Sequence, residues 1–129
     1  MTDARYLLAA ATTGHYALFA GGSYSTNRMD AVDVYDENLL RLTPLTLSVP
    51  YGNHAGISKE GFAVFAGGYG PSLHKNIEAF DETLTRIPLE GLSVARDSLA
   101  AAHTGKHILF GGGGSSTSGK DTVDVYTIN

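Results

Sequence analysis

Short apolar runs alternate with glycine-rich and polar stretches along the whole chain. The runs are 4 to 7 residues long and rich in Val, Ile, Tyr and Phe, and they are bounded by Gly, Asn, Asp and Ser. Such residues are typical of β-strands and tight turns. An amphipathic helix would show an apolar stripe with a period of 3.6 residues, and no 11-residue window has a convincing one. The pattern therefore predicts an all-β protein.

One apolar run returns three times and ends in a glycine pair each time. It reads YALFAGG at residues 16–22, FAVFAGG at 62–68 and HILFGGG at 107–113. Phe65 lies 46 positions after Phe19, and Phe110 lies 45 positions after Phe65. A second run follows each pair at the same spacing: VDVYD at 32–36, IEAFD at 77–81 and VDVYT at 123–127. Matches in a common register predict structural repeats, here a single domain (1–129) with repeats at about 1–50, 51–95 and 96–129.

Each complete repeat is expected to form four antiparallel strands. In the second repeat we expect them near residues 53–58, 62–66, 76–80 and 84–88. Lys59, Glu60 and Gly61 are expected to form the first turn, and Asp81 suits an Asx-type turn. The strand that begins at Phe62 has no polar alternation, so we expect it to be covered on both faces.

These residues resemble the kelch repeat, particularly its bacterial variants. The resemblance rests on the glycine pairs Gly21-Gly22, Gly67-Gly68 and Gly112-Gly113, followed by Tyr35-Asp36, Phe80-Asp81 and Tyr126. Arg5 and Arg96 match the arginine that opens the first strand of that repeat, and Tyr51 replaces it in the second repeat. The tryptophan typical of the fourth strand is missing, with Leu42 or Ile87 near its place. The resemblance covers almost the whole chain and implies β-propeller blades.

The number of repeats raises the question of closure. The chain holds two complete repeats and a third that lacks its last strand, whereas propellers typically close with 4 to 8 blades. Either the chain is a fragment of a longer protein or copies assemble. We expect self-association, in which two three-blade chains form a six-bladed ring with two-fold symmetry.

Composition narrows the classes of partner. The chain is 43% hydrophobic and 17% charged, with a formal net charge of −4. This charge argues against nucleic acid and against an anionic membrane surface as partners. Cysteine is absent, and no apolar run approaches the roughly 20 residues of a membrane span. Residues 1–11 superficially resemble a signal sequence, but Asp3 lies where positive charge is expected. We expect a soluble chain of unknown compartment, with no cofactor.

Several motifs have structural interpretations that we prefer to functional ones. Residues 114–120 match a phosphate loop except that Asp121 replaces the final Ser or Thr, and a strand rather than a helix is expected to follow. His103 and His107 could meet across a hairpin, but two histidines alone make a weak metal site. His54 and His74 are expected at the surface or at an edge. The acids recurring once per repeat are expected to be architectural: Asp33, Glu78 and Asp124.

The segments after the glycine pairs differ in sequence although the flanking strands stay alike. Loops on a rigid framework are free to differ, so they form either a binding face or merely a tolerant surface. In a propeller these loops are expected at one end, together with the connections between blades around Tyr51 and Arg96. The binding hypothesis names nine contact residues from the two sets: Tyr24, Asn27, Arg28, Tyr51, Asn53, Tyr69, His74, Arg96 and Lys120. We therefore expect a non-catalytic binding or scaffolding module with a protein or glycan partner. The alternatives are a structural unit of a larger surface, secreted or phage-like assembly, and an enzyme whose channel site is completed by oligomerisation.

Overall fold

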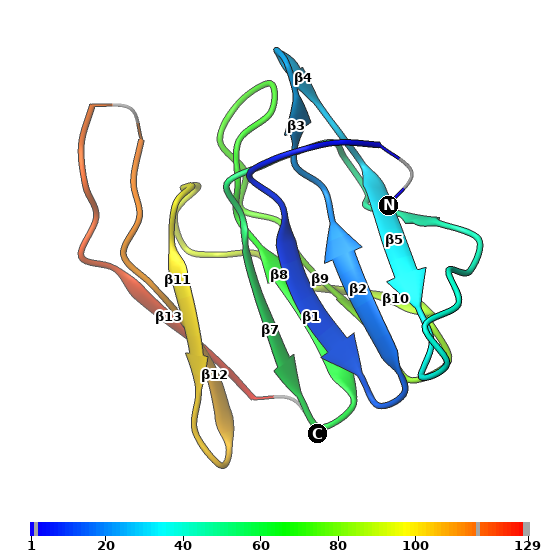
Figure 1. Cartoon of the computed structure of the whole chain (residues 1–129). Coiled ribbons are helices and arrows are strands. Elements are labelled where there is room, and N and C mark those ends of the chain that lie inside the picture. The colour runs from blue at the N-terminus through cyan, green and yellow to red at the C-terminus, as the bar shows by residue number, and fades with distance from the viewer. Residues whose placement is uncertain (2, 116, 128–129) are drawn as a thin grey trace.

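The computed structural model describes residues 1, 3–115 and 117–127, which form three antiparallel sheets and one short hairpin and contain no helix (Figure 1). The first sheet contains β1 (Ala9–Thr13), β2 (Tyr16–Ala20), β5 (Ala31–Tyr35) and β6 (Leu45–Thr46). The second contains β7 (Ala55–Lys59), β8 (Phe62–Ala66), β9 (Ile77–Phe80) and β10 (Arg86–Leu89). The third contains β11 (Ala100–His103), β12 (His107–Gly111) and β13 (Val123–Thr127). The prediction of an all-β chain is confirmed.

The strands expected in the second repeat are found with small shifts at their ends. The strand β8 has the expected bounds, and β7 extends through Lys59, so only Glu60 and Gly61 form the turn. The Asx turn forms as expected, since Asp81 Oδ1 accepts hydrogen bonds from the backbone N–H groups of Thr83 and Thr85. The sequence analysis did not predict the hairpin β3 (Ser23–Tyr24) and β4 (Asn27–Arg28). Among the described residues there is no helix long and apolar enough to cross a membrane.

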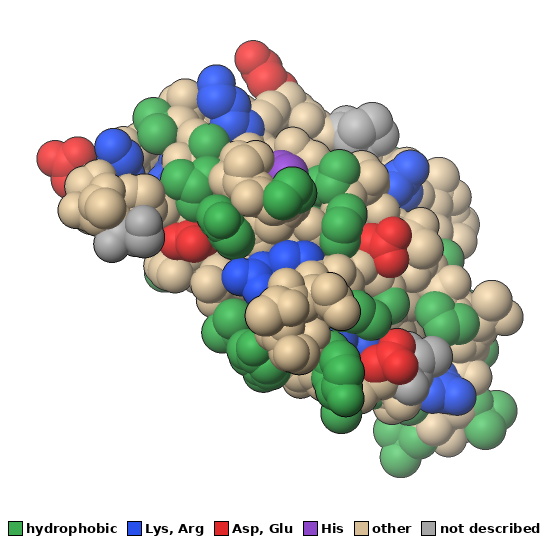
Figure 2. All heavy atoms as spheres, turned by 90° about the horizontal axis from the view of Figure 1, so that it is seen from above, with side chains coloured by type: hydrophobic (Ala, Val, Ile, Leu, Met, Phe, Trp, Pro, Cys, Tyr) green, Lys and Arg blue, Asp and Glu red, His purple; other side chains and the backbone are tan. Residues whose placement is uncertain are grey.

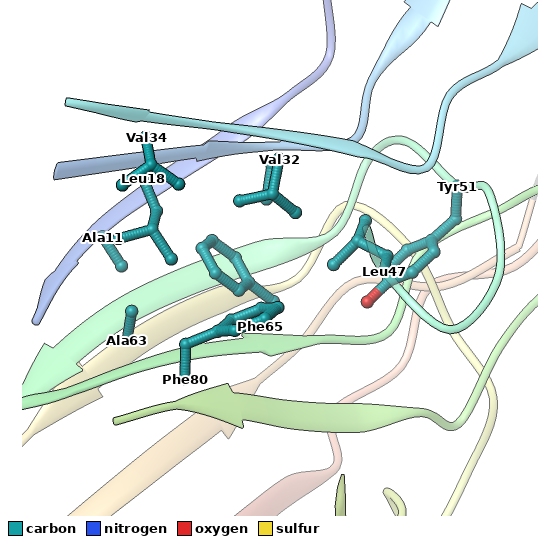
Figure 3. Close-up of a cluster of buried hydrophobic side chains, with 10 residues drawn as sticks. Ala11, Leu18, Val32, Val34, Leu47, Tyr51, Ala63, Phe65 and Phe80 are labelled. Atoms are coloured by element: carbon teal, nitrogen blue, oxygen red, sulfur yellow. The ribbon is translucent and has the colours of Figure 1, made fainter. Parts of the chain in front are cut away.

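The sheets pack face to face in chain order. Between the first and second sheets lies a core to which Leu18, Val32 and Val34 contribute from one side, and Phe65 and Phe80 from the other (Figure 3). All five side chains are almost fully buried. At roughly 1.5–3 kcal/mol for each such side chain, this burial is what holds the two sheets together.

A second core, between the second and third sheets, uses the opposite face of the second sheet. It contains Val64 and Ile77 from that sheet, and Ile108 and Phe110 from the third. Every residue of β8 from Ala63 to Ala66 is therefore buried, which confirms the expectation that this strand is covered on both faces.

The first strand of each sheet lies beside the first strand of the next. The strands β1, β7 and β11 are neighbours in Figure 1, and their residues are in contact. The Thr12 N–H donates to Ser58 Oγ at 2.7 Å, which links the first two sheets. The buried Lys59 ammonium donates to the Gly105 carbonyl at 3.0 Å, which links the second sheet to the third. The sheets therefore fan out from one shared row of short strands.

Buried polar anchors recur once per sheet, at the positions that the repeat alignment singled out. Arg5 forms an ion pair with Asp33 at 2.8 Å, and Arg96 forms one with Asp124 at 2.9 Å. In the second sheet the Tyr51 hydroxyl faces Glu78 at 3.5 Å, and the Ser48 N–H donates to the same carboxylate at 3.0 Å. Each acid therefore holds the segment that enters its own sheet, which is the architectural role expected of the three recurring acids.

Candidate functional site

The most structured part of the surface is the end of the sheets at which the glycine pairs lie. Both glycines of each pair have positive φ, for example 66° and 104° at Gly21 and Gly22, and they turn the chain out of the sheet. A Cβ on Gly68 would come within 2.6 Å of the Tyr51 ring and 2.9 Å of the Gly52 carbonyl oxygen. Only glycine fits there, so this close approach fixes where the loops leave the framework. We call this end, which Figure 2 views from above, the loop end.

Two adjoining hollows lie at the loop end, and they share Arg28 and Tyr69. The first has a volume of about 510 Å³ and is completed by Thr26, Asn27, Pro50, Gly70 and Pro71. The second has a volume of about 420 Å³ and is completed by Asn53, Leu73, Asp97, Ser98 and Ser115. In the space-filling view, charged and hydrophobic side chains are interspersed over this end (Figure 2).

Arg28 is held in place between the two hollows. Its Nε donates to the Tyr69 carbonyl at 3.0 Å, and its Nη1 donates to Ser23 Oγ at 2.7 Å. The guanidinium carbon lies 5.4 Å from the centroid of the Tyr69 ring, within cation–π range. The Tyr69 side chain is still 40% exposed. A fixed cation beside an accessible aromatic ring is suited to binding, because little side-chain freedom is left to lose.

The four predicted contact residues that line these hollows are Asn27, Arg28, Asn53 and Tyr69. Tyr24 and Lys120 are exposed but line neither hollow. His74 is half-buried, and its Nε2 lies 2.6 Å from the Gly70 carbonyl oxygen, so it supports the loop from below.

Two of the predicted contact residues lie in the interior, which corrects their placement on the loop face. The side chains of Tyr51 and Arg96 are fully buried. Arg96 donates to the carbonyls of Phe110 and Gly112 as well as to Asp124. Burial, followed by the nearby Glu78 carboxylate, raises the pKa of the Tyr51 phenol far above its usual value. A partner at the surface cannot reach either group, so they act as framework.

The expectation that His54 lies at the surface or an edge was wrong. His54 is only 7% exposed, and its ring lies 4.7 Å from the ring of Tyr51. Burial lowers the pKa of His54 to about 4. The equivalent positions in the other repeats hold Leu8 and Leu99, so a neutral imidazole occupies an apolar position of the repeat.

Sequence reasoning missed Asp97 and Ser98 in the second hollow. A signal was available, since Ser98 follows Asn53 by 45 residues and occupies the same position of the repeat. Both residues have positive φ, of 60° and 55°. What the sequence did not reveal is that successive sheets bring these two turns to one hollow.

The histidine pair His103 and His107 does not meet across its hairpin, and the segment at 114–120 leads into a strand, as expected for it. His103 pairs with Ile108 across the hairpin, so successive residues of β12 place His107 on the opposite face of the sheet. In the segment from 114 to 120, the described residues form no helix, and β13 follows. Among the described residues, no group of three or more His, Asp or Glu side chains could hold a metal ion.

A further hollow of about 510 Å³ lies at the opposite end, where the hairpin turns of the three sheets meet. Its lining includes Ser58, Lys59, Glu60 and His103. Lys59 is already bonded to Glu60 and to the Gly105 carbonyl, so its charge is used within the fold.

No known protein family model matches this chain, and no curated protein matches it either. The kelch resemblance therefore stays a prediction that rests on the motifs of the chain itself.

Proposed function

We propose that this chain is a non-catalytic binding module built from kelch-like propeller blades, and that it recognises a partner through its loop end. The observation that carries the proposal is the pair of hollows that meet at Arg28 and Tyr69. Four of the predicted contact residues line these hollows, although they come from three separate segments of the chain.

The blade interpretation is supported by the relation between the sheets. Each antiparallel sheet packs on the next, with its first strand on the inside of the fan. The three aromatic pairs Phe19–Tyr35, Phe65–Phe80 and Phe110–Tyr126 have ring centroids 6.0, 6.4 and 6.0 Å apart. The same packing unit therefore recurs in every sheet, as a propeller requires.

The chemistry of the hollows favours a glycan over a protein segment. The second hollow offers an amide from Asn53, a carboxylate from Asp97 and a hydroxyl from Ser98, next to the exposed Tyr69 ring. Amides and carboxylates supply directional donors and acceptors, and the ring supplies an apolar face. Sugars carry hydroxyl groups around a partly apolar ring and match this combination. A concave site with a few placed polar groups is also the usual form of a small-ligand site.

The test compares two tyrosines at the same end of the molecule. The chain is screened on a glycan array, and hits are measured by isothermal titration calorimetry. Tyr69→Ala should weaken binding by about tenfold or more, as for a central aromatic contact. Tyr24→Ala is the matched control, since Tyr24 is 60% exposed but lines neither hollow. Equal losses in both variants would contradict a site at the hollows.

A protein partner is the other outcome of the same experiment. If the array stays empty, a peptide-display library selected on the chain should yield binders that Tyr69→Ala weakens and Tyr24→Ala does not. If neither library yields a binder sensitive to Tyr69, the binding function is refuted.

A further inference from the structure

The outer face of the third sheet is apolar and uncovered, unlike the same face of the other sheets. Val123 and Val125 are each 55% exposed. The residues at these positions of the repeat are Val32 and Val34 in the first sheet, both fully buried, and Ile77 and Ala79 in the second, 3% and 1% exposed. In those sheets the next sheet of the chain covers them. The outer face of the third sheet is therefore equivalent to faces that, elsewhere in the chain, are covered by a further sheet.

The first sheet presents the matching cover at the other end of the chain. Within the chain, the layer that covers each pair of buried aliphatic residues contains an aromatic pair, Phe65–Phe80 or Phe110–Tyr126. Phe19 and Tyr35 form the same pair in the first sheet, with ring centroids 6.0 Å apart, and both remain half-buried. The Met1 amino group donates to the Tyr35 hydroxyl at 2.7 Å.

Two ladders of backbone hydrogen bonds connect successive sheets, and the next step of each ladder would connect the third sheet to a first sheet. In the first ladder the Asn53 N–H donates to the Leu7 carbonyl at 3.0 Å, and the Ser98 N–H donates to the Asn53 carbonyl at 2.8 Å. These three residues share a positive φ of 55° to 60°. The next step of the ladder would join the Ser98 carbonyl to the N–H of a residue in the position of Leu7.

The second ladder uses the glycine pairs. The Gly22 N–H donates to the Tyr51 carbonyl, and the Gly68 N–H donates to the Arg96 carbonyl, both at 2.9 Å. The next donor in this series is Gly113, and the residue whose carbonyl corresponds to those of Tyr51 and Arg96 is Arg5. In the first ladder, the next acceptor is on the third sheet and the matching donor is on the first. In the second ladder, the next donor is on the third sheet and the matching acceptor is Arg5, at the start of the first.

We propose that two copies of this chain close into one ring of six sheets, in which the third sheet of each copy packs on the first sheet of the other. Val123 and Val125 of one copy cover Phe19 and Tyr35 of the second. The Leu7 N–H of each copy donates to the Ser98 carbonyl of the other copy. The Gly113 N–H of each copy donates to the Arg5 carbonyl of the other copy. Rings of 4 to 8 blades close, so two copies of three sheets fit, whereas three copies would give nine.

The proposed ring goes beyond partner recognition, and it can be wrong while the proposed binding function is right, or the reverse. The loop end with its two hollows lies within one copy, so a monomer can still bind a ligand there. Loss of the ring and loss of ligand binding are therefore separate results.

The first experiment measures the mass of the 129-residue chain by light scattering on a size-exclusion column. We expect about twice the chain mass of 13.6 kDa. Val125→Lys should give the mass of one chain, because it puts a charge into the proposed contact. Because Val125 is already 55% exposed, the circular dichroism and thermal melting of the variant should stay those of a folded chain. Thr85→Lys is the control: Thr85 is exposed and directly precedes β10 of the second sheet, which already has a sheet packed on each face, so this variant should keep the doubled mass.

The second experiment tests the register of the contact by disulfide trapping, for which the absence of native cysteine is convenient. In Leu7→Cys/Ser98→Cys, each new cysteine should lie beside its counterpart in the other copy, within the Cα separation that a disulfide spans. We expect a covalent two-chain species on a non-reducing gel. The pair Asn53→Cys/Ser98→Cys is the control, because these neighbours lie in one chain and should give a covalent monomer.

Four results would overturn the ring or its register. The wild-type chain could have the mass of one chain, or Val125→Lys could keep the doubled mass. The trapped species could also be a ladder of three, four and more chains, which would show open head-to-tail association. A control pair that closes while Leu7→Cys/Ser98→Cys stays uncrosslinked would equally reject the proposed register.

Discussion

The second and third sheets are anchored at the same position of the repeat by different chemistry. In the third sheet a fully buried arginine, Arg96, donates to three carbonyls and to Asp124. In the second sheet Tyr51 takes this place and has one long contact to Glu78, of 3.5 Å. In both sheets the acid also accepts a backbone N–H from the preceding segment, at 3.0 Å from Ser48 to Glu78 and at 3.2 Å from Ser93 to Asp124. The comparison shows that the repeat conserves a buried donor–acceptor position and tolerates a change in its charge.

The largest expected effect comes from removing the charged anchor. Arg96→Met leaves the carbonyls of Phe110 and Gly112 without their donor and Asp124 without its ion pair. Breaking a buried pair from one side costs about 3–5 kcal/mol. Urea unfolding should show this loss in the free energy of unfolding. The exposed Arg41 is the control, and Arg41→Met should change the free energy of unfolding by no more than about 0.5 kcal/mol. Equal effects in the two variants would mean that the Arg96 network is not a structural anchor.

The next effect concerns the neutral histidine beside the Tyr51 anchor. His54 has a pKa of about 4 in the fold and about 6.5 when unfolded, so the unfolded chain binds the extra proton between these values. Stability should therefore be complete above pH 6.5 and fall by about 3 kcal/mol as the pH drops to 4. Thermal melts across this range measure the slope. His54→Leu, which copies the residue of the other repeats, should remove most of it, and an unchanged slope in this variant would assign the effect elsewhere.

A smaller effect is expected when the anchor of the second sheet is converted to the arginine–aspartate type of the other two sheets. Tyr51→Arg and Glu78→Asp each mix the two anchor types and should each destabilise the second sheet. The double variant recreates the pairing of the first and third sheets, so it should recover at least about 1 kcal/mol relative to the sum of the single losses. A double-mutant cycle by urea unfolding provides the measurement. Strict additivity would show that the two residues do not act as one anchor.

The smallest effect lies at the outer turn of the second sheet. Hydrogen bonds from the Thr83 side chain and from the backbone of Thr85 hold the pKa of the half-buried Asp81 below its usual value. The turn should therefore be slightly more stable once the carboxylate is ionised. Asp81→Ala should lower the melting temperature slightly at pH 7, and Asp81→Asn should lower it less. A variant that melts like the wild type would mean that the turn forms without the side-chain bonds.

Much of the fold could be predicted because it depends on local patterns. The repeat register located the strands of the second sheet to within about two residues, and the glycine pairs located the loops. The hairpin of β3 and β4 was missed because its strands are only two residues long and carry no alternation.

The candidate site was predicted only in part. Divergent loops identified Arg28 and Tyr69, whose side chains leave the framework at the surface. Reasoning from the connections between blades placed Tyr51 and Arg96 at the surface, because a polar residue between strands resembles a contact residue until its partner is known. Their partners, Glu78 and Asp124, are 27 and 28 residues away in the chain. Burial of a polar group depends on such distant partners, which a local pattern does not encode.

The sequence by itself determined the all-β architecture, the three repeats, the turn positions and the apolar faces, since each follows from residue type and spacing along the chain. Only the tertiary structure decided which polar residues are interior anchors, that His54 is buried, and that Arg28 and Tyr69 join two hollows. It also decided that the uncovered valines of the third sheet and the aromatic pair of the first lie on opposite end faces. These outcomes depend on how one sheet stacks on the next, because stacking brings together groups that are a whole repeat apart in the chain.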